Sequence, residues 1–191
     1  MKSSTPDLEA LSDNFLMVQV REGDLDRLGL LFERYKKPLF GFFYGLNREQ
    51  ELSEDLVQNT FLRILKYRHL FRGEGEFRAW MFQIARNVNH DHHRANKIKV
   101  KEELNDWQNK LGHQENQVTE MVKADDEQRL SLALERLPTE KREVLLLSKF
   151  QEKKYQEIGE ILGCSEGAVK VKVFRALQEL REVYKKLEKT M

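Results

Sequence analysis

The sequence predicts an all-α protein of two small helical domains joined by a flexible acidic linker. The second domain is expected to contain a helix-turn-helix. Glycine and proline are scarce, at 10 and 3 of 191 residues, so few turn-formers are available for a many-stranded sheet. Leucine, phenylalanine and valine recur at helical rather than alternating spacing through most of the chain. The length fits one to two domains of about 150 residues each, which excludes a barrel enzyme with a second domain.

The overall charge predicts no partner, because 33 basic and 32 acidic residues leave a net charge of +1. The single cysteine, Cys164, can form neither an internal disulfide nor a cysteine-rich metal site, and we expect it to be a small core residue. The first residues lack the apolar stretch of a signal peptide, and the most apolar segment, residues 39–46, is far shorter than the ~20 residues that span a bilayer. We therefore expect a soluble protein of the cytoplasm, where thiols stay reduced, with no cofactor.

The first domain is expected over residues 13–100 and begins with two helices. A short helix over residues 14–22 ends at Gly23, and Asp24 is placed to cap the second helix. Pro38 is expected to bend or break that second helix, because proline lacks the N–H group that a helix interior needs.

Two further helices complete this domain. The third begins with acidic residues, which suit the positive end of the helix dipole, and carries apolar residues along one side. Residues 72–76 interrupt the pattern before a fourth helix at about residues 77–95. In that helix Trp80, Ile84 and Val88 recur at four-residue spacing, which places them on one face.

The character of the chain then changes. Residues 102–127 contain eight acidic residues and two lysines, and their hydrophobicity is too low for a core of their own. We therefore predict a linker at residues 101–125 and a second domain of four helices over residues 126–188. Pro138 ends the first helix of that domain, and Thr139 is expected to cap the next.

The most specific local pattern is found in residues 155–175, which meet the requirements of a helix-turn-helix. Gly159 lets a neighbouring helix approach closely, Gly163 permits a sharp turn, and Ser165 can cap the second helix. The apolar side chains expected to pack the two helices together are Ile158, Ile161, Leu162, Val169 and Val173. The second helix of such a motif enters the major groove of DNA.

This second helix and its continuation are basic, although the whole chain is nearly neutral. Six basic residues outweigh two acidic ones: Lys170, Lys172, Arg175, Arg181, Lys185 and Lys186 against Glu179 and Glu182. An ordinary helical hairpin with a solvated basic face is the alternative interpretation. It leaves the coincidence of the two glycines and the capping serine unexplained.

A second basic zone lies at the end of the first domain. Between residues 86 and 101 five basic residues oppose one aspartate, and Phe77, Trp80 and Phe82 precede them. Aromatic faces next to basic side chains suit single-stranded nucleic acid, whose bases stack and whose phosphates attract cations. Most of these aromatic residues are nevertheless expected in the core, because they recur at helical spacing.

The same helix carries His90, His92 and His93 around Asp91. A metal-dependent hydrolase is the alternative that this cluster leaves open, since His90 and His93 could share a helix face. A catalytic zinc site needs a third protein ligand and an open position, and the chain has no HExxH pattern. A polar helix face beside phosphate is the favoured interpretation.

The two basic zones lie in segments that are similar to a known family. Over residues 13–186 the sequence resembles the extracytoplasmic-function group of bacterial RNA polymerase sigma factors. The matching stretches are SEDLVQNTFLR (53–63), FRG (71–73), FRAWMFQIARN (77–87), Leu137-Pro138, EVLLL (143–147) and the helix-turn-helix. The resemblance implies a two-domain, non-catalytic subunit for promoter recognition. Its implied partners are core RNA polymerase, promoter DNA and an anti-sigma factor.

The resemblance also implies roles for particular residues. Three residues would lie on the helix that binds the clamp of the largest polymerase subunit: Asp55, Gln58 and Phe61. Four would open and read the minus-ten element: Phe77, Trp80, Arg86 and Asn87. Four would reach the minus-thirty-five element: Lys170, Lys172, Phe174 and Arg175. Val171 and Leu177 depart from the family pattern, in which a polar or basic residue and an arginine are common at these positions.

A conventional transcription factor, with the same helix-turn-helix and an amino-terminal ligand-sensing domain, is the remaining alternative. Such a protein would need a dimer surface and a ligand pocket, and it would bind a palindromic site without polymerase. The order and spacing of the motifs in both domains favour the sigma-factor interpretation.

Overall fold

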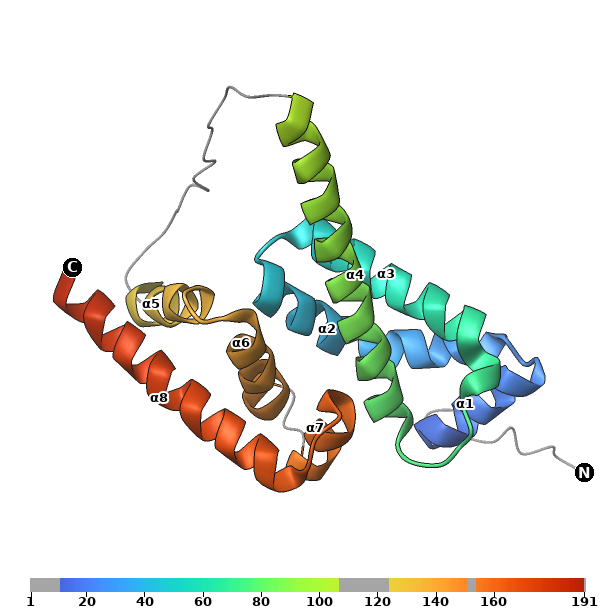
Figure 1. Cartoon of the computed structure of the whole chain (residues 1–191). Helices are drawn as coiled ribbons and strands as arrows, with labels where there is room; N and C mark the ends of the chain where they lie inside the picture. The colour runs from blue at the N-terminus through green and yellow to red at the C-terminus, as the bar shows by residue number, and fades with distance from the viewer. Residues whose placement is uncertain (1–10, 107–123, 151–153, 191) are drawn as a thin grey trace, which may run out of the picture.

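The computed structural model describes residues 11–106, 124–150 and 154–190, and these contain helices and no strand. The amino-terminal unit consists of α1 (Asp13–Glu22), α2 (Asp26–Asn47), α3 (Gln50–Tyr67) and α4 (Phe77–Asp106) (Figure 1). The carboxy-terminal unit consists of α5 (Ala124–Glu135), α6 (Thr139–Leu145), α7 (Tyr155–Leu162) and α8 (Glu166–Thr190). A 3-10 turn, Arg68–Leu70, follows α3, and a π-helical turn, Leu146–Phe150, follows α6. The prediction of an all-α fold is confirmed.

The first helix has the boundaries that the sequence indicates, but the start of the second differs. Ser12 Oγ accepts a hydrogen bond from the Phe15 N–H at 3.2 Å, and Gly23, with φ of 112°, ends α1. Asp24 does not cap α2, which begins without a side-chain cap. Its carboxylate instead accepts a charge-assisted hydrogen bond from Arg27 Nε at 2.9 Å.

Pro38 does not break the second helix, so this half of the prediction is wrong. α2 is one helix of 22 residues with Pro38 inside it. Tyr35 and Leu39, on either side of the proline, are buried, and α2 packs against α1, α3 and α6. This tertiary packing compensates for the hydrogen bond that proline cannot donate.

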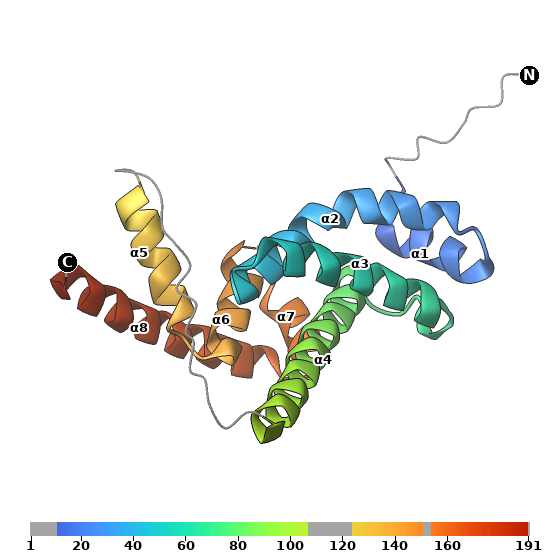
Figure 2. The same ribbon diagram turned by 90° about the horizontal axis from the view of Figure 1, so that it is seen from above.

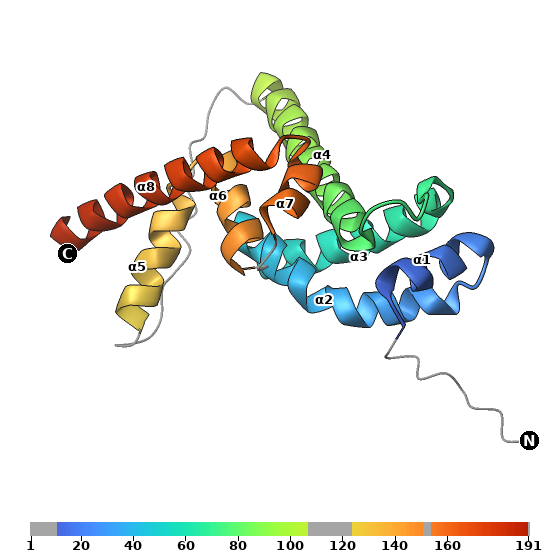
Figure 3. The same ribbon diagram turned by 90° about the horizontal axis from the view of Figure 1, so that it is seen from below.

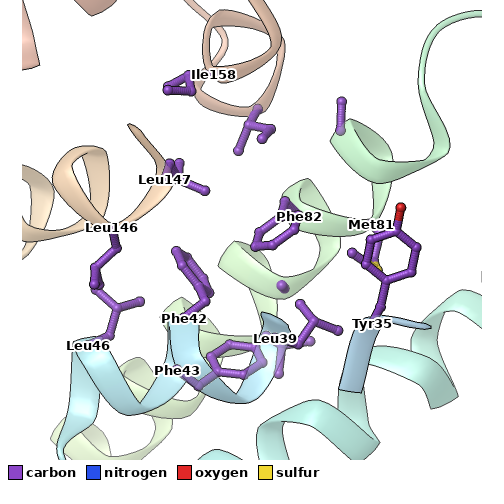
Figure 4. Close-up of a cluster of buried hydrophobic side chains, with 14 of the residues drawn as sticks. Tyr35, Leu39, Phe42, Phe43, Leu46, Met81, Phe82, Leu146, Leu147 and Ile158 are labelled. Carbon is purple, nitrogen blue, oxygen red and sulfur yellow. The ribbon is translucent and has the colours of Figure 1, made fainter. Parts of the chain in front are cut away.

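One hydrophobic core extends through both units. Figure 4 shows Phe42 and Leu46 of α2 directed toward Leu146 and Leu147, which follow α6. The side chain of Leu146 also packs directly on the backbone of α2, because a Cβ atom added to Gly45 would lie 2.5 Å from one of its methyl carbons. The two units are therefore held together by the same kind of apolar packing that forms each of them.

α7 packs against both α4 and α8 and so connects the two units. Figures 2 and 3 show α8 leading away from this contact along the outer side of the carboxy-terminal unit. Among the described residues no helix is both long and apolar enough to cross a bilayer.

Two element boundaries differ from the predicted ones. α4 continues to Asp106, so the expected start of the linker at residue 101 lies inside a helix, and residues 107–123 lie outside the described part of the chain. Thr139 is the first residue of α6, while Pro138 takes the capping position without a side-chain hydrogen bond. The fixed φ angle of proline fits the capping position, but its ring carries no acceptor, so the first N–H groups of α6 have no side-chain cap.

Candidate nucleic-acid interface

The turn between α7 and α8 has the geometry of a helix-turn-helix. Gly163 has a φ of 67°, in the left-handed region that glycine adopts at no steric cost. Ser165 Oγ accepts a hydrogen bond from the Ala168 N–H at 3.2 Å and so caps α8. A Cβ atom on Gly159 would lie 2.6 Å from the carbonyl oxygen of Cys164, so the close approach is made by the turn itself. The predicted roles of Gly163 and Ser165 are confirmed.

α8 presents one side to the core and the opposite side to solvent. Val169, Val173 and Ala176 are buried. The four side chains predicted to reach the minus-thirty-five element are all exposed: Lys170, Lys172, Phe174 and Arg175. Phe174 keeps 61% of its surface accessible, which is unusual for so large an apolar side chain. The structure thus gathers these four residues around the open side of one helix.

Lys170 is paired within its own helix. Its Nζ lies 2.8 Å from Oε1 of Glu166, one turn earlier, and this hydrogen bond raises the pKa of Lys170. The two side chains are 60% and 51% exposed, so water screens the attraction between them. Lys170 can therefore exchange Glu166 for a phosphate at little cost.

The aromatic residues of α4 lie at the edge of the core. Phe77 has no exposed surface, and its ring centroid lies 5.8 Å from that of Tyr35 and 6.0 Å from that of Phe71. Trp80 is half-buried, with its ring 5.3 Å from Phe71. Phe77 therefore offers no face to a base in this structure, because neighbouring rings enclose it, whereas Trp80 keeps part of its ring at the surface.

Arg86, which the resemblance assigns to the minus-ten element, is bound by the carboxy-terminal unit. Its Nε and Nη2 donate to the two carboxylate oxygens of Glu143 at 2.7 and 3.2 Å, and its Nη1 donates to the carbonyl oxygen of Ile161 at 2.9 Å. The side chain of Glu143 is only 6% exposed. Such two-point pairing is among the strongest polar contacts in proteins. Asn87, the next residue, remains exposed.

A second pair of the same kind lies two turns earlier on α4. Arg78 Nε and Nη2 donate to the carboxylate oxygens of Glu157 at 2.8 and 2.9 Å, and this hydrogen bonding raises the pKa of Arg78. Between the two pairs, Gln83 Nε2 donates to the carbonyl oxygen of Glu160 at 2.8 Å. One polar side of α4 is therefore covered by α6 and α7.

Arg142 of α6 strengthens the contact between the units. Its Nη1 donates to the carbonyl oxygen of Leu46 at 2.8 Å, at the end of α2, and its Nε donates to that of Leu134 at 2.9 Å. Burial lowers the pKa of Arg142. The residues predicted from the sequence to be functional include neither Arg142 nor Glu157, and Glu143 entered only as the first residue of the stretch EVLLL, an acidic residue directly before an apolar run.

α2 and α3 form another exposed surface. Asp55 and Gln58 are exposed one turn apart on α3, whereas Phe61 is buried with its ring 5.0 Å from that of Phe32. Gln58 borders a groove of about 320 Å³ between the two helices. The other residues that line this groove are Phe32, Lys36, Lys37, Phe40, Glu54 and Val57. An apolar floor with charged margins suits an amphipathic helix.

The histidine cluster of α4 is used in pairwise contacts. Asp91 accepts hydrogen bonds from Arg63 at 2.7 Å and from Arg94 at 3.2 Å, and the bond from Arg63 lowers the pKa of Asp91. His93 Nε2 lies 2.7 Å from Oδ1 of Asn47. Within the described ranges, no three histidine, cysteine or acidic side chains converge as metal ligands.

Both units match known protein families. Residues 31–98 match Sigma-70 region 2, and residues 127–180 match Sigma-70, region 4. The chain is 30% identical over 178 residues to RNA polymerase sigma factor CarQ of Myxococcus xanthus, a match that covers 90% of this chain and 97% of the relative. It is 28% identical over 158 residues to ECF RNA polymerase sigma factor SigM of Bacillus subtilis, covering 81% and 93% of the two chains.

Two solved structures have a similar fold. One is CnrH in complex with the cytosolic domain of CnrY, with a TM-score of 0.67 at 24% identity over 90% of this chain and 96% of that one. The other is the sigma factor RpoE of Bartonella quintana in complex with the anti-sigma factor NepR. Its TM-score is 0.63 at 26% identity, over 85% of this chain and 97% of that one.

Proposed function

The chain belongs to the sigma-70 family of RNA polymerase sigma factors, in the extracytoplasmic-function group, and on that premise we propose how its surfaces divide the work of promoter recognition. It is a transcription initiation factor that directs RNA polymerase to promoters, and it is not an enzyme. The units proposed for this work are residues 13–100 and 126–188, with residues 101–125 between them.

The open face of α8 carries the proposal for the minus-thirty-five element. Lys170, Lys172, Phe174 and Arg175 surround the exposed side of a helix whose start is fixed by the Ser165 cap. A capped helix with an open basic side fits the major groove, where cations meet phosphates and the remaining side chains meet base edges. This geometry is the observation that supports the function best.

The surface of α2 and α3 is proposed as the docking site for the clamp of the largest polymerase subunit. Asp55 and Gln58 provide polar contacts beside the apolar groove, and Phe61 shapes its floor from below through its contact with Phe32. The expected contact is a helix laid into this groove, with its apolar side against Phe32 and Phe40.

The surface of α4 is proposed to bind the minus-ten element, with Trp80 stacking on a base and Asn87 contacting a base edge. Arg86 would neutralise a phosphate, and Phe77 would support Trp80 from the core. The two donors that Arg86 uses on Glu143, Nε and Nη2, are the ones it would offer to a phosphate in the same two-point geometry, so this geometry is open to a phosphate only when Glu143 is released. The proposal therefore requires α6 and α7 to leave α4 before this element binds, while the covalent connection through residues 101–125 keeps both units on the same polymerase.

The remaining proposed partner is an anti-sigma factor, because RpoE of Bartonella quintana, which has a similar fold, is described in complex with one. The compartment proposed is the bacterial cytoplasm, since the promoter DNA and the polymerase on which the chain acts are found there.

Run-off transcription tests the function directly. The full chain is added to core RNA polymerase on a library of promoters with random upstream and minus-ten sequences, and the transcribed templates are sequenced. We expect two enriched elements at a fixed spacing, both dependent on the chain. Transcription that is independent of the chain, or enrichment of a palindrome that the chain binds without polymerase, would contradict the proposal.

The polymerase contact has its own test. Replacing Asp55 and Gln58 together by alanine removes two exposed side chains and no core contact, so the helical content of the chain should not change. Association with core polymerase should weaken about tenfold, which corresponds to a loss of about 1.4 kcal/mol and is in the range found for interface side chains. Unchanged capture of core polymerase by the folded double variant would remove this surface from the proposal.

A further inference from the structure

The exposed face of α8 carries two apolar side chains. Val171 and Phe174 are 48% and 61% exposed, and they lie one helical turn apart on the same face. Val169 and Val173, which alternate with them in sequence, are buried on the opposite side. Val171 and Phe174 thus form an exposed apolar crest in the half of α8 that follows the turn.

Cations flank this apolar crest. Lys170, Lys172 and Arg175 are exposed around Val171 and Phe174, so any partner must combine negative charge at its margins with apolar groups at its centre. The major groove of DNA has this arrangement, with phosphates along both walls and base edges on its floor. Among the base edges only thymine presents an apolar group, its 5-methyl.

We propose that Val171 and Phe174 read the 5-methyl groups of thymines in the upstream promoter element. This assignment rests on the proposed function of α8, and it adds a base preference that comes from the departure at Val171. A polar or basic residue at this position would favour a base that offers hydrogen-bonding groups. Valine has no hydrogen bond to give, so contact with a methyl group is the interaction by which it discriminates among bases.

The experiment replaces each thymine of the upstream element by deoxyuridine, which removes the methyl group and keeps every hydrogen-bonding atom. The holoenzyme formed from core polymerase and the full chain is first used to select its preferred upstream element from random duplexes. We expect at least one thymine in that element whose replacement weakens binding about fourfold. This factor corresponds to ~0.8 kcal/mol, the transfer free energy of one buried methyl or methylene group.

Variants then assign the effect to the two side chains. Val171→Ala and Phe174→Ala should each bind the thymine and deoxyuridine duplexes with more nearly equal affinity, while Val171→Thr, which keeps one methyl group, should retain part of the difference. Phe15→Ala is the matched control, because Phe15 is 47% exposed on α1 and has no assigned role. It should keep the whole fourfold difference.

The outcomes separate this inference from the function on which it rests. A holoenzyme that selects an upstream element but does not distinguish thymine from deoxyuridine overturns the methyl contact and leaves the proposed function in place. The same holds if the difference persists undiminished in Val171→Ala and Phe174→Ala. If no upstream element is selected at all, the assignment of α8 to promoter DNA fails, and this inference fails with it.

Discussion

The two surfaces proposed to bind DNA differ in what their cations contact in the free chain. On α8 the four side chains predicted to reach DNA are exposed, and Lys170 pairs with an exposed glutamate on its own helix. On α4 the guanidinium groups of Arg78 and Arg86 are each held at two points by a glutamate of the other unit. The basic side chains among the four on α8 are therefore accessible to a phosphate, whereas Arg78 and Arg86 of α4 already bind carboxylates.

This difference arises from the acceptors rather than from the arginines. Glu143 and Glu157 are nearly enclosed, and a carboxylate in such a place needs a cation beside it. A carboxylate also resembles a phosphate in charge and in its two-point geometry toward guanidinium. The carboxy-terminal unit thus covers α4 with groups that DNA phosphates would have to displace, whereas duplex DNA can approach α8 as it stands.

Among the variants that test this difference between α4 and α8, replacement of Arg86 should have the largest effect. Arg86→Ala leaves Glu143 enclosed without its cation, and the free energy of unfolding should fall by about 3–5 kcal/mol. Urea unfolding of the full chain, followed by circular dichroism, measures this loss. The control is Arg94→Ala, because Arg94 and its partner Asp91 are 77% and 41% exposed. Its cost should be about 0–1 kcal/mol, and equal losses in both variants would show that the Glu143 contact does not hold the units together.

Replacing Trp80 addresses the part of α4 that keeps some exposed surface. Trp80→Ala should permit binding of holoenzyme to duplex promoter DNA but reduce strand opening by about 1–3 kcal/mol, the value of stacking one base on an aromatic ring. Permanganate reactivity of thymines in the minus-ten region measures strand opening. Because Trp80 also contacts Phe71, thermal unfolding of the variant is measured in parallel. A variant that opens promoters normally would limit Trp80 to its packing role.

Local sequence signals predicted the helices and the turn that positions α8. Gly163 and Ser165 act through neighbours within a few residues, so their roles could be assigned from spacing alone. The contacts that cover α4 could not be predicted this way, because Arg86 and Glu143 lie 57 residues apart in sequence. Helical spacing predicted most of the aromatic residues in the core, and Phe77 and Phe82 are buried there, but spacing could not show that Trp80 keeps part of its surface exposed.

Substitutions on the exposed side of α8 should change DNA binding by an intermediate amount. Arg175→Ala should relax the base preference at one position, with a loss of ~1–3 kcal/mol, if Arg175 contacts a base edge. Loss of a phosphate contact, expected for Lys172→Ala, should weaken binding to all sequences and reduce the salt dependence by about one unit of slope. Lys185→Ala is the control and should do neither. Holoenzyme binding to permuted upstream elements at two salt concentrations distinguishes these outcomes, and wild-type behaviour of all three variants would move promoter choice to the amino-terminal unit.

The smallest effect is expected at the exposed ion pair between Arg63 of α3 and Asp91 of α4. Arg63 Nη1 lies 2.7 Å from Asp91 Oδ2, and its hydrogen bond lowers the pKa of Asp91. A carboxyl group with a lowered pKa stabilises the folded chain above its unfolded-state pKa of about 3.9, and this contribution is lost as the pH falls through the folded-state value. Arg63→Ala should therefore cost stability at pH 7 but nothing once Asp91 is protonated in both proteins.

Titration of the Asp91 carboxyl by NMR, in the wild type and in Arg63→Ala, measures this effect, and the variant should titrate at a higher pH. Salt provides the contrast with the enclosed pair. The side chains of Arg63 and Asp91 are 37% and 41% exposed, so added salt should screen their attraction and shrink the difference between the two titrations. Salt should change the cost of Arg86→Ala much less, because Glu143 is shielded from counterions. Equal salt sensitivity at both pairs would mean that water reaches the α4 contact as freely as it reaches the outer surface.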